Sequence, residues 1–203
     1  MQEQKKISAV VLAGGQSKRM QTNDKGLQLL LGKPLVCFSL KSVTEITDDI
    51  FLSANRNQAQ YQQFGFPVVA DENDRFDGPL AGVLAVMKRS VREVLLVIPC
   101  DLPLLTAEHL RRLLHGVTAE TEIAVAYDGN RLHPTVMAVR ISLAADLDAY
   151  LHGGARKLQD WIVTHRWRKV DFADCAASFR NINSLEELAQ LEIELSESGK
   201  VPG

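Results

Sequence analysis

The sequence predicts an α/β protein in which a doubly wound, mostly parallel mixed sheet lies between two layers of helices. A continuous apolar run at residues 7–12 suits a strand buried on both faces, and residues 93–99 (EVLLVIP) form a second such run. Strand-like segments alternate with segments of helical spacing as far as about residue 114, which is typical of a three-layer architecture. Ligands bind such sheets outside the carboxyl ends of the strands. The segments that follow four residues should therefore converge: Leu12, Ala54, Ala70 and Pro99.

The elements of the first half follow from apolar runs and from the turn residues between them. Strands are expected at residues 7–12, 49–54, 66–70 and 93–99, and helices at residues 35–43, 55–63, 80–89 and 107–114. Pro34 marks the start of the first of these helices, because the fixed φ of proline suits a helix start. Gly78-Pro79 precedes the third helix in the same way.

The second half is expected to form a hairpin and three helices. Asp128-Gly129-Asn130 is a turn sequence between two apolar runs, which predicts an antiparallel pair and hence a mixed sheet. Ser142 is placed to cap a helix reaching about residue 151, and Ser184 with Glu187 forms a capping box for the last helix. The hairpin strands are residues 123–127 and 134–139, and the remaining helices are residues 158–163 and 185–195.

Composition and charge favour a globular protein with a small ligand. The 203 residues fit one domain, and 46% hydrophobic with 24% charged residues is ordinary globular usage. A formal net charge of −2 provides no large field for binding a nucleic-acid backbone. The three widely spaced cysteines indicate neither a disulfide framework nor a CxxC metal site, so a reducing compartment is expected. The apolar run at residues 7–13 is too short for a membrane span, which leaves the cytoplasm as the expected location.

The segment at residues 12–25, LAGGQSKRMQTNDK, predicts a polyphosphate site. Its glycines, Gly14 and Gly15, allow backbone N–H groups to approach an anion closely, and three cations follow. These cations are Lys18, Arg19 and Lys25. The pattern is neither the P-loop nor the GxGxxG of dinucleotide-binding proteins. A solvated basic loop is the alternative interpretation.

Asp101 is the candidate metal ligand. It follows the central strand at residues 93–99, and Mg²⁺ is typically bound by one or two carboxylates together with substrate phosphates. The alternative is that Asp101 caps the turn after it. Cys100 beside it is expected to be a small apolar residue rather than a nucleophile, and His133 is expected to have a structural rather than a catalytic role.

The pattern LxGGxSxRM followed shortly by DK resembles that of nucleotidyltransferases, and specifically of the molybdenum cofactor guanylyltransferase family. Further motifs occur in the order found in that family: GKPL at residues 32–35, ANR at 54–56, GPLAG at 78–82, PCDLP at 99–103, HPT at 133–135 and NIN at 181–183. The resemblance implies a Rossmann-like nucleotidyltransferase fold and the transfer of GMP from GTP to the terminal phosphate of molybdenum-molybdopterin. The products would be molybdopterin guanine dinucleotide and pyrophosphate.

The resemblance also implies roles for individual residues. Nucleotide contacts are expected at Leu12, Ala13, Gly14, Gly15, Lys25, Ser53, Asp71 and Asp101, and acceptor contacts at Arg156, Asn181 and Asn183. Catalysis would rest on Lys25, Arg19 and Asp101, with Asp101 holding Mg²⁺. The nucleotide-binding half would span about residues 1–115, and the acceptor-binding half about residues 116–203. Asp71 could instead belong to a solvated acidic loop, and the two asparagines could serve ordinary turns.

The chain departs from the family pattern at two positions, and other functions are therefore considered. Gln21 stands where glycine usually follows RM, and Ser53 stands where relatives often carry asparagine. The alternatives are a nucleotidyltransferase that uses CTP or another phosphorylated acceptor, a non-catalytic cofactor carrier and a nicotinamide dehydrogenase. The expected partners are GTP and molybdenum-molybdopterin, with molybdoenzymes or other cofactor-assembly proteins as further partners and no nucleic acid or membrane.

Overall fold

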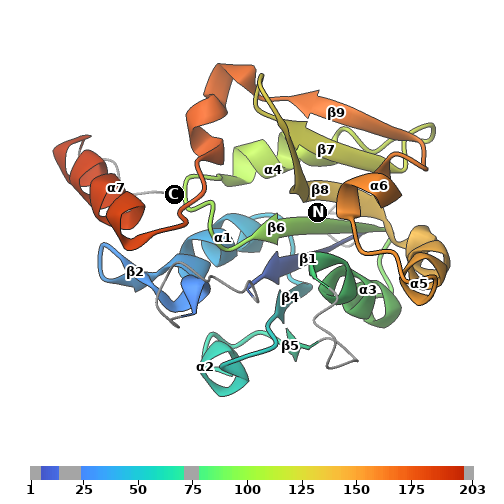
Figure 1. Cartoon of the computed structure of the whole chain (residues 1–203), viewed down its shortest axis with the longest axis horizontal. Coiled ribbons are helices and arrows are strands. Elements are labelled where there is room, and N and C mark those ends of the chain that lie inside the picture. Colours follow the sequence, from blue (N-terminus) through green and yellow to red (C-terminus); the bar gives the residue numbers. More distant parts are fainter. Residues whose placement is uncertain (1–5, 14–23, 71–77, 199–203) are drawn as a thin grey trace.

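The computed structural model describes residues 6–13, 24–70 and 78–198, and its centre is a seven-stranded sheet in the order β5-β4-β1-β6-β8-β7-β9 (Figure 1). Within this sheet β8 alone runs opposite to the other strands, which confirms the mostly parallel, mixed sheet predicted from the sequence. The strands are β1 (Ile7–Leu12), β4 (Ile50–Ser53), β5 (Val68–Val69), β6 (Val94–Pro99), β7 (Ile123–Tyr127), β8 (Leu132–Arg140) and β9 (Trp167–Asp171). A separate hairpin pairs β2 (Leu29–Leu30) with β3 (Lys33–Pro34).

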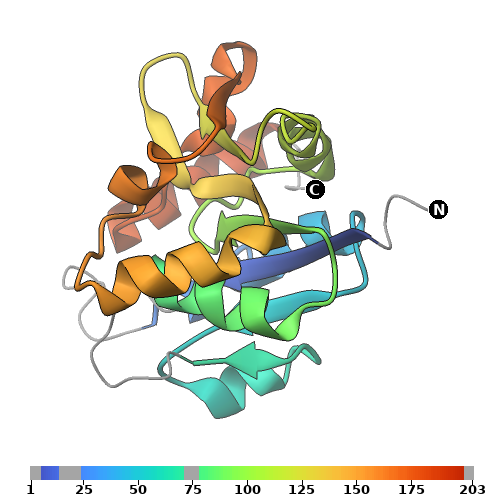
Figure 2. The same cartoon turned by 90° about the vertical axis from the view of Figure 1, so that its right-hand side faces the viewer.

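Helices cover both faces of the sheet. The side chains of β1 point alternately to the two faces, and they are buried on both. Ala9 and Val11 of β1 pack into the core on the side of α1 and α4, whereas Val10 packs into the core on the side of α3, α5 and α6. Figure 2 shows α3 and α5 side by side on one face. The helices are α1 (Leu35–Thr44), α2 (Gln58–Gln62), α3 (Pro79–Arg89), α4 (Ala107–Leu114), α5 (Ala144–His152), α6 (Leu158–Ile162) and α7 (Leu185–Ser198), with 3-10 turns η2 (Lys25–Leu27), η3 (Ile141–Leu143) and η4 (Ala173–Phe179).

The expected elements occur in the expected order, but the hydrogen bonds that cap two of the helices differ from the prediction. Ser142 does not cap α5, because it lies inside η3, and α5 begins two residues later at Ala144 without a side-chain cap. Ser184 does cap α7 by accepting a hydrogen bond from the Glu187 N–H at 3.1 Å. A full capping box would also require the Glu187 carboxylate to accept from the N–H of Ser184. This part of the prediction is wrong, because the carboxylate accepts from the N–H of Asn183 at 2.5 Å.

The sequence pattern did not predict β9. This strand pairs in parallel with β7 at the edge of the sheet, where Arg168 and Lys169 are exposed and Val170 is half buried. An edge strand with charged side chains lacks the apolar alternation on which strand prediction relies. The hairpin of β2 and β3 was also missed, and it turns through Leu31 and Gly32 with positive φ at both residues.

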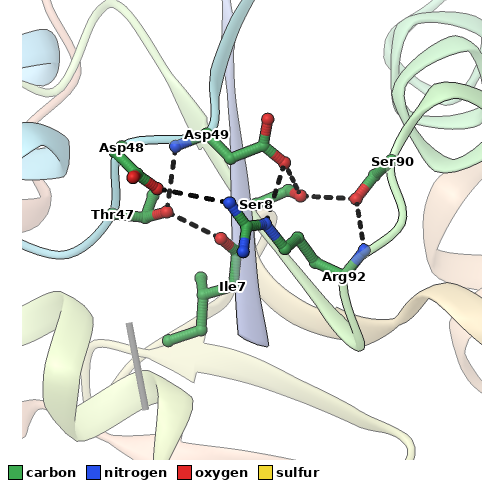
Figure 3. Close-up of polar contacts among 7 residues, drawn as sticks. All are labelled: Ile7, Ser8, Thr47, Asp48, Asp49, Ser90 and Arg92. Carbon is green, nitrogen blue, oxygen red and sulfur yellow. Dashed lines mark hydrogen bonds and ion pairs between the residues drawn. The ribbon is translucent and has the colours of Figure 1, made fainter. Parts of the chain in front are cut away.

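A polar cluster joins the amino ends of β1 and β4 to the connection between α3 and β6 (Figure 3). The hydroxyl of Ser8 is fully buried, donates to Asp49 and lies 2.5 Å from the hydroxyl of Ser90. Arg92 pairs with Asp49 at 3.7 Å, and the Thr47 hydroxyl donates to the carbonyl of Ile7 at 2.6 Å. The buried hydroxyl is thus satisfied, as a buried polar group must be. This edge of the sheet is therefore tied together by side chains.

No helix in the described ranges has both the length and the apolar character required to cross a membrane.

We expect Val97→Ala to lower the free energy of unfolding by about 2 kcal/mol, because it removes two methyl groups and leaves a cavity in β6. Val97 is fully buried, whereas Val91, just before the same strand, is 94% exposed. The matched control Val91→Ala should change the value by less than about 0.5 kcal/mol. Urea unfolding followed by circular dichroism measures both, and equal effects would contradict the assignment of β6 to the core.

Candidate active site

The carboxyl ends of the central strands meet through backbone hydrogen bonds. The N–H of Ala13 donates to the carbonyl of Ser53 at 2.8 Å, and the N–H of Cys100 donates to the carbonyl of Leu12 at 3.0 Å. The N–H of Ala54 donates to the carbonyl of Val69 at 2.9 Å in the same way. The predicted convergence is confirmed for Ala13, Ala54 and Cys100, the residues that follow Leu12, β4 and Pro99, whereas the segment after Ala70 lies outside the described residues. Leu12 and Ala13 lie at its centre, between β4 and β6.

Lys25 connects the N-terminal half of the chain to its C-terminal part at this edge. Its ammonium lies 2.5 Å from Oδ2 of Asp101 and donates to Oδ1 of Asn183 at 2.8 Å. The side chains of Lys25 and Asp101 are only 12% and 16% exposed, so solvent screens the ion pair weakly. Three predicted site residues that are up to 158 positions apart in sequence are thereby brought together.

A backbone hydrogen bond fixes the asparagine-bearing segment beside Asp101. The N–H of Ile182 donates to the carbonyl of Asp101 at 2.9 Å, and the Ile182 side chain is fully buried. The Ile182 side chain therefore packs into the core. Asn181 and Asn183 flank this anchored residue, with Asn181 accepting from Arg131 at 3.2 Å and Asn183 from Lys25. Each asparagine is therefore paired with a cation.

Asp101 retains unused capacity for a ligand. Its Oδ1 atom is buried and has no hydrogen-bond partner in the described part of the chain, which is costly for a carboxylate oxygen. The described residues contain no cluster of three or more His, Cys, Asp or Glu side chains that could hold a metal alone. Mg²⁺ needs no such cluster when substrate phosphates supply ligands. The free oxygen of Asp101 fits that mode of binding.

Asp24 and Tyr61 hold the turn that carries Lys25, a role that no sequence motif predicted. Asp24 Oδ1 accepts from the Gly26 N–H at 3.2 Å and from the Tyr61 hydroxyl at 2.6 Å, which caps η2 at the residue before Lys25. Tyr61 is fully buried, and burial together with the charge of Asp24 raises its pKa above the usual range. A Cβ atom at Gly26 would lie 2.5 Å from the Tyr61 hydroxyl. The close packing explains why glycine follows Lys25.

Ser53 is the last residue of β4 and packs against the start of α3. It is 7% exposed, and a Cβ atom at Gly82 would lie 2.1 Å from its Oγ and 2.9 Å from its Cβ. Gly82 of the GPLAG motif therefore permits α3 to approach the end of β4. This contact places the first turn of α3 at the edge of the sheet that carries the site.

Arg156 donates hydrogen bonds to backbone carbonyls near the end of α5 and in the segment that follows it. Its NH1 group donates to the carbonyls of Leu151 and Ala155, both at 2.7 Å, near the end of α5. The neighbouring helices α5 and α6 pack with α3 against one face of the sheet, whereas Asn181 and Asn183 are beside Asp101. The acceptor role of Arg156 therefore stays a prediction.

Four predicted site residues fall outside the described residues: Gly14, Gly15, Arg19 and Asp71. The same is true of Lys18 and of Gln21, the position that departs from the family pattern. Cys100 is described, and burial followed by the negative charge of Asp101 raises the pKa of its thiol above the usual range. A protonated thiol is a poor nucleophile, in agreement with the apolar role predicted for it.

Comparison with known proteins confirms the resemblance drawn from the motifs. The model of the MobA-like NTP transferase domain matches residues 9–170. The molybdenum cofactor guanylyltransferase of Shewanella sp. (strain MR-4) is 41% identical over 193 residues, which cover 95% of this chain and 98% of that protein.

Solved structures share the fold at lower identity. Molybdopterin-guanine dinucleotide biosynthesis protein A from Archaeoglobus fulgidus has a TM-score of 0.77 at 20% identity, covering 94% of this chain and 99% of that chain. A CMP:2-keto-3-deoxy-manno-octonic acid synthetase solved with CTP has a TM-score of 0.73 at 13% identity, covering 95% and 99%. The Rossmann-like nucleotidyltransferase fold predicted from the sequence is confirmed.

We expect Gly82→Ala to lower the free energy of unfolding by about 1–3 kcal/mol, because the new methyl group would collide with Ser53. Ser53→Gly removes both clashing atoms, so the double variant should be more stable than the sum of the single effects by about 1 kcal/mol or more. Thermal unfolding of the four proteins measures this coupling.

Gly153→Ala is the matched control, since its nearest non-neighbour atoms would lie at an ordinary 3.4 Å. Strict additivity of the Gly82 and Ser53 substitutions would contradict the predicted contact.

Proposed function

Because the chain belongs to the molybdenum cofactor guanylyltransferase family, we propose that it transfers GMP from GTP to the terminal phosphate of molybdenum-molybdopterin and releases pyrophosphate. The observation that carries this proposal is the meeting of Lys25, Asp101 and Asn183 at the carboxyl edge of the sheet. We place the reaction in the cytoplasm, with molybdoenzymes or cofactor-assembly proteins as recipients of the product.

Within one domain, the two halves of the chain would bind different substrates. Lys25 and Asp101 belong to the half that would hold the nucleotide, residues 1–115, and Asn183 belongs to the half that would hold the acceptor, residues 116–203. Their direct hydrogen bonds support a shared site in which the attacking phosphate and the α-phosphate of GTP are aligned. Such alignment is the main requirement of the reaction, because the acceptor phosphate is already ionised and needs no general base.

Lys25 would stabilise the negative charge of the triphosphate. An ammonium group has three N–H donors, and Asp101 and Asn183 engage it with two contacts, which leaves one donor for a phosphate oxygen. In the low-exposure setting of this pair, a fixed positive charge is more effective than in water. Asp101 would hold Mg²⁺ through its free oxygen, and the ion would neutralise charge on the phosphates.

The remaining roles come from the family pattern. Backbone groups of Leu12, Ala13, Gly14 and Gly15 would approach the phosphates, Arg19 would assist Lys25, and Ser53 and Asp71 would contact the nucleotide. Arg156 and Asn181 would contact the acceptor with Asn183. A carrier that does not react would have no evident need for the Lys25 and Asp101 pair at a triphosphate site.

We expect labelled GTP, and not labelled CTP, to be incorporated when each is incubated with molybdenum-molybdopterin and Mg²⁺. Pyrophosphate release should accompany incorporation, which separates an enzyme from a carrier. Radiolabel in the dinucleotide product and a coupled pyrophosphate assay are the two measurements. Incorporation from CTP alone would refute guanylyl transfer, and binding of GTP without pyrophosphate would favour the carrier.

We expect Lys25→Met to lower kcat by about 100-fold to 1000-fold, because it removes one preorganised donor of transition-state charge. Methionine preserves most of the side-chain volume, so unfolding measured in parallel should show a folded protein. Lys6→Met is the matched control: Lys6 also forms an ion pair, with Glu93 at 3.1 Å, but at the amino edge of the sheet. Full turnover by Lys25→Met would remove Lys25 from the catalytic residues.

A further inference from the structure

The hairpin turn between β7 and β8 opens onto the same edge of the sheet as Asp101. Strand β8 is antiparallel to both β6 and β7, so β7 runs in the direction of β6 and its carboxyl end reaches the edge that holds Asp101. The turn that follows carries Arg131, whose guanidinium donates to Oδ1 of Asn181 at 3.2 Å. Arg131 therefore reaches the segment that flanks Asp101, although it belongs to none of the motifs in the sequence.

Asp128 stabilises this turn mainly through contacts other than the guanidinium of Arg131. Its Oδ1 accepts the N–H groups of Asn130 and Arg131 at 2.8 and 2.7 Å, and its Oδ2 lies 2.7 Å from Nε2 of His133. Burial would raise the pKa of Asp128, but these three donors lower it to about 2, so the carboxylate stays ionised. The Arg131 Nε lies farther away, at 3.8 Å. The close donors satisfy the carboxylate and leave the guanidinium free to contact other groups.

His133 holds the base of the turn, which agrees with the structural role predicted for it. It is buried, and its ring packs on Phe179 with centroids 5.0 Å apart. Phe179 precedes Asn181 by two residues, so the turn and the asparagine segment share one packed support. The backbone that carries Arg131 is therefore held in place by packing, whereas the Arg131 side chain itself is 61% exposed.

The two cations fix how the asparagine amides are oriented. Lys and Arg are donors only, so the atoms that face Lys25 and Arg131 must be the amide oxygens of Asn183 and Asn181. Each amide therefore keeps its NH2 group for another partner, and none is present for either group among the described residues. Arg131, Asn181, Asn183 and Lys25 together form a row of donors that suits an anionic ligand.

We propose that Arg131 binds negative charge on the acceptor at a point remote from the reacting phosphorus, with Asn181 as its partner. This inference rests on the proposed function. Arg131 contacts Asn181 whereas Lys25 contacts Asn183, two residues or about 7 Å of extended chain further on, so Arg131 would meet a part of the acceptor away from the phosphate that Lys25 holds. Binding energy at such a distance is the same in the ground state and the transition state, so it lowers the acceptor KM without changing kcat.

The test compares steady-state kinetics of the wild-type protein with Arg131→Ala, Arg131→Lys and the control Arg180→Ala. Arg131→Ala should raise the KM for molybdenum-molybdopterin about tenfold or more, with kcat and the KM for GTP within about twofold of wild type. Arg131→Lys should recover part of the loss, because it retains the charge but not the planar fork. Arg180→Ala removes an equal charge one residue from Asn181, but Arg180 pairs with Glu194 of α7 at 2.7 Å, so the acceptor KM should not change.

An unchanged acceptor KM in Arg131→Ala would overturn the proposal, as would equal increases in both KM values or an equal effect of Arg180→Ala. Equilibrium binding of molybdenum-molybdopterin, measured anaerobically by ultrafiltration without nucleotide, separates this proposal from the proposed function. If wild type binds the acceptor but does not transfer GMP, a weaker affinity of Arg131→Ala still supports the role of Arg131. If wild type binds no acceptor, both proposals fail.

Discussion

The parallel pairing of β1 with β4 and β6 is the constraint on which the site depends. Because these strands run in one direction, Ala13, Ala54 and Cys100 all leave the sheet at the same edge, and backbone hydrogen bonds hold them in register. β1 can occupy the centre because its side chains are apolar on both faces. At the opposite edge, the polar cluster around Ser8 holds the starting points of the same strands together.

The second requirement is that the C-terminal part of the chain returns to this edge. The reversal at β8 makes it possible, since β7 and β9 then end on the same side as β6, and η4 leads on to Asn181. The Ile182 hydrogen bond to Asp101 makes the return specific, because it joins the backbones and buries an apolar side chain at the same point. Residues from the two halves of the chain therefore meet at one place.

Charge at the site is balanced in a way that suits anionic substrates. Asp101 pairs closely with Lys25 at 2.5 Å, whereas Asp128 lies 3.8 Å from Nε of Arg131 and is engaged mainly by other donors. Each cation has N–H groups beyond those that its contacts use in the described part of the chain, because an ammonium carries three such groups and a guanidinium five, and these can bind a phosphate or another anion. The asparagines between them turn their oxygens toward the cations.

The sequence by itself determined the α/β class, the order of the main elements and the motif residues Lys25 and Asp101, because apolar periodicity and short motifs are local properties of a chain. It did not reveal β9, whose charged edge position removes the apolar signal, or the support of Lys25 by Asp24 and Tyr61. Only the tertiary structure decided that Asn183 meets Lys25 and that Arg131 meets Asn181. Such contacts depend on strand direction and on where the chain returns, which a single sequence does not contain.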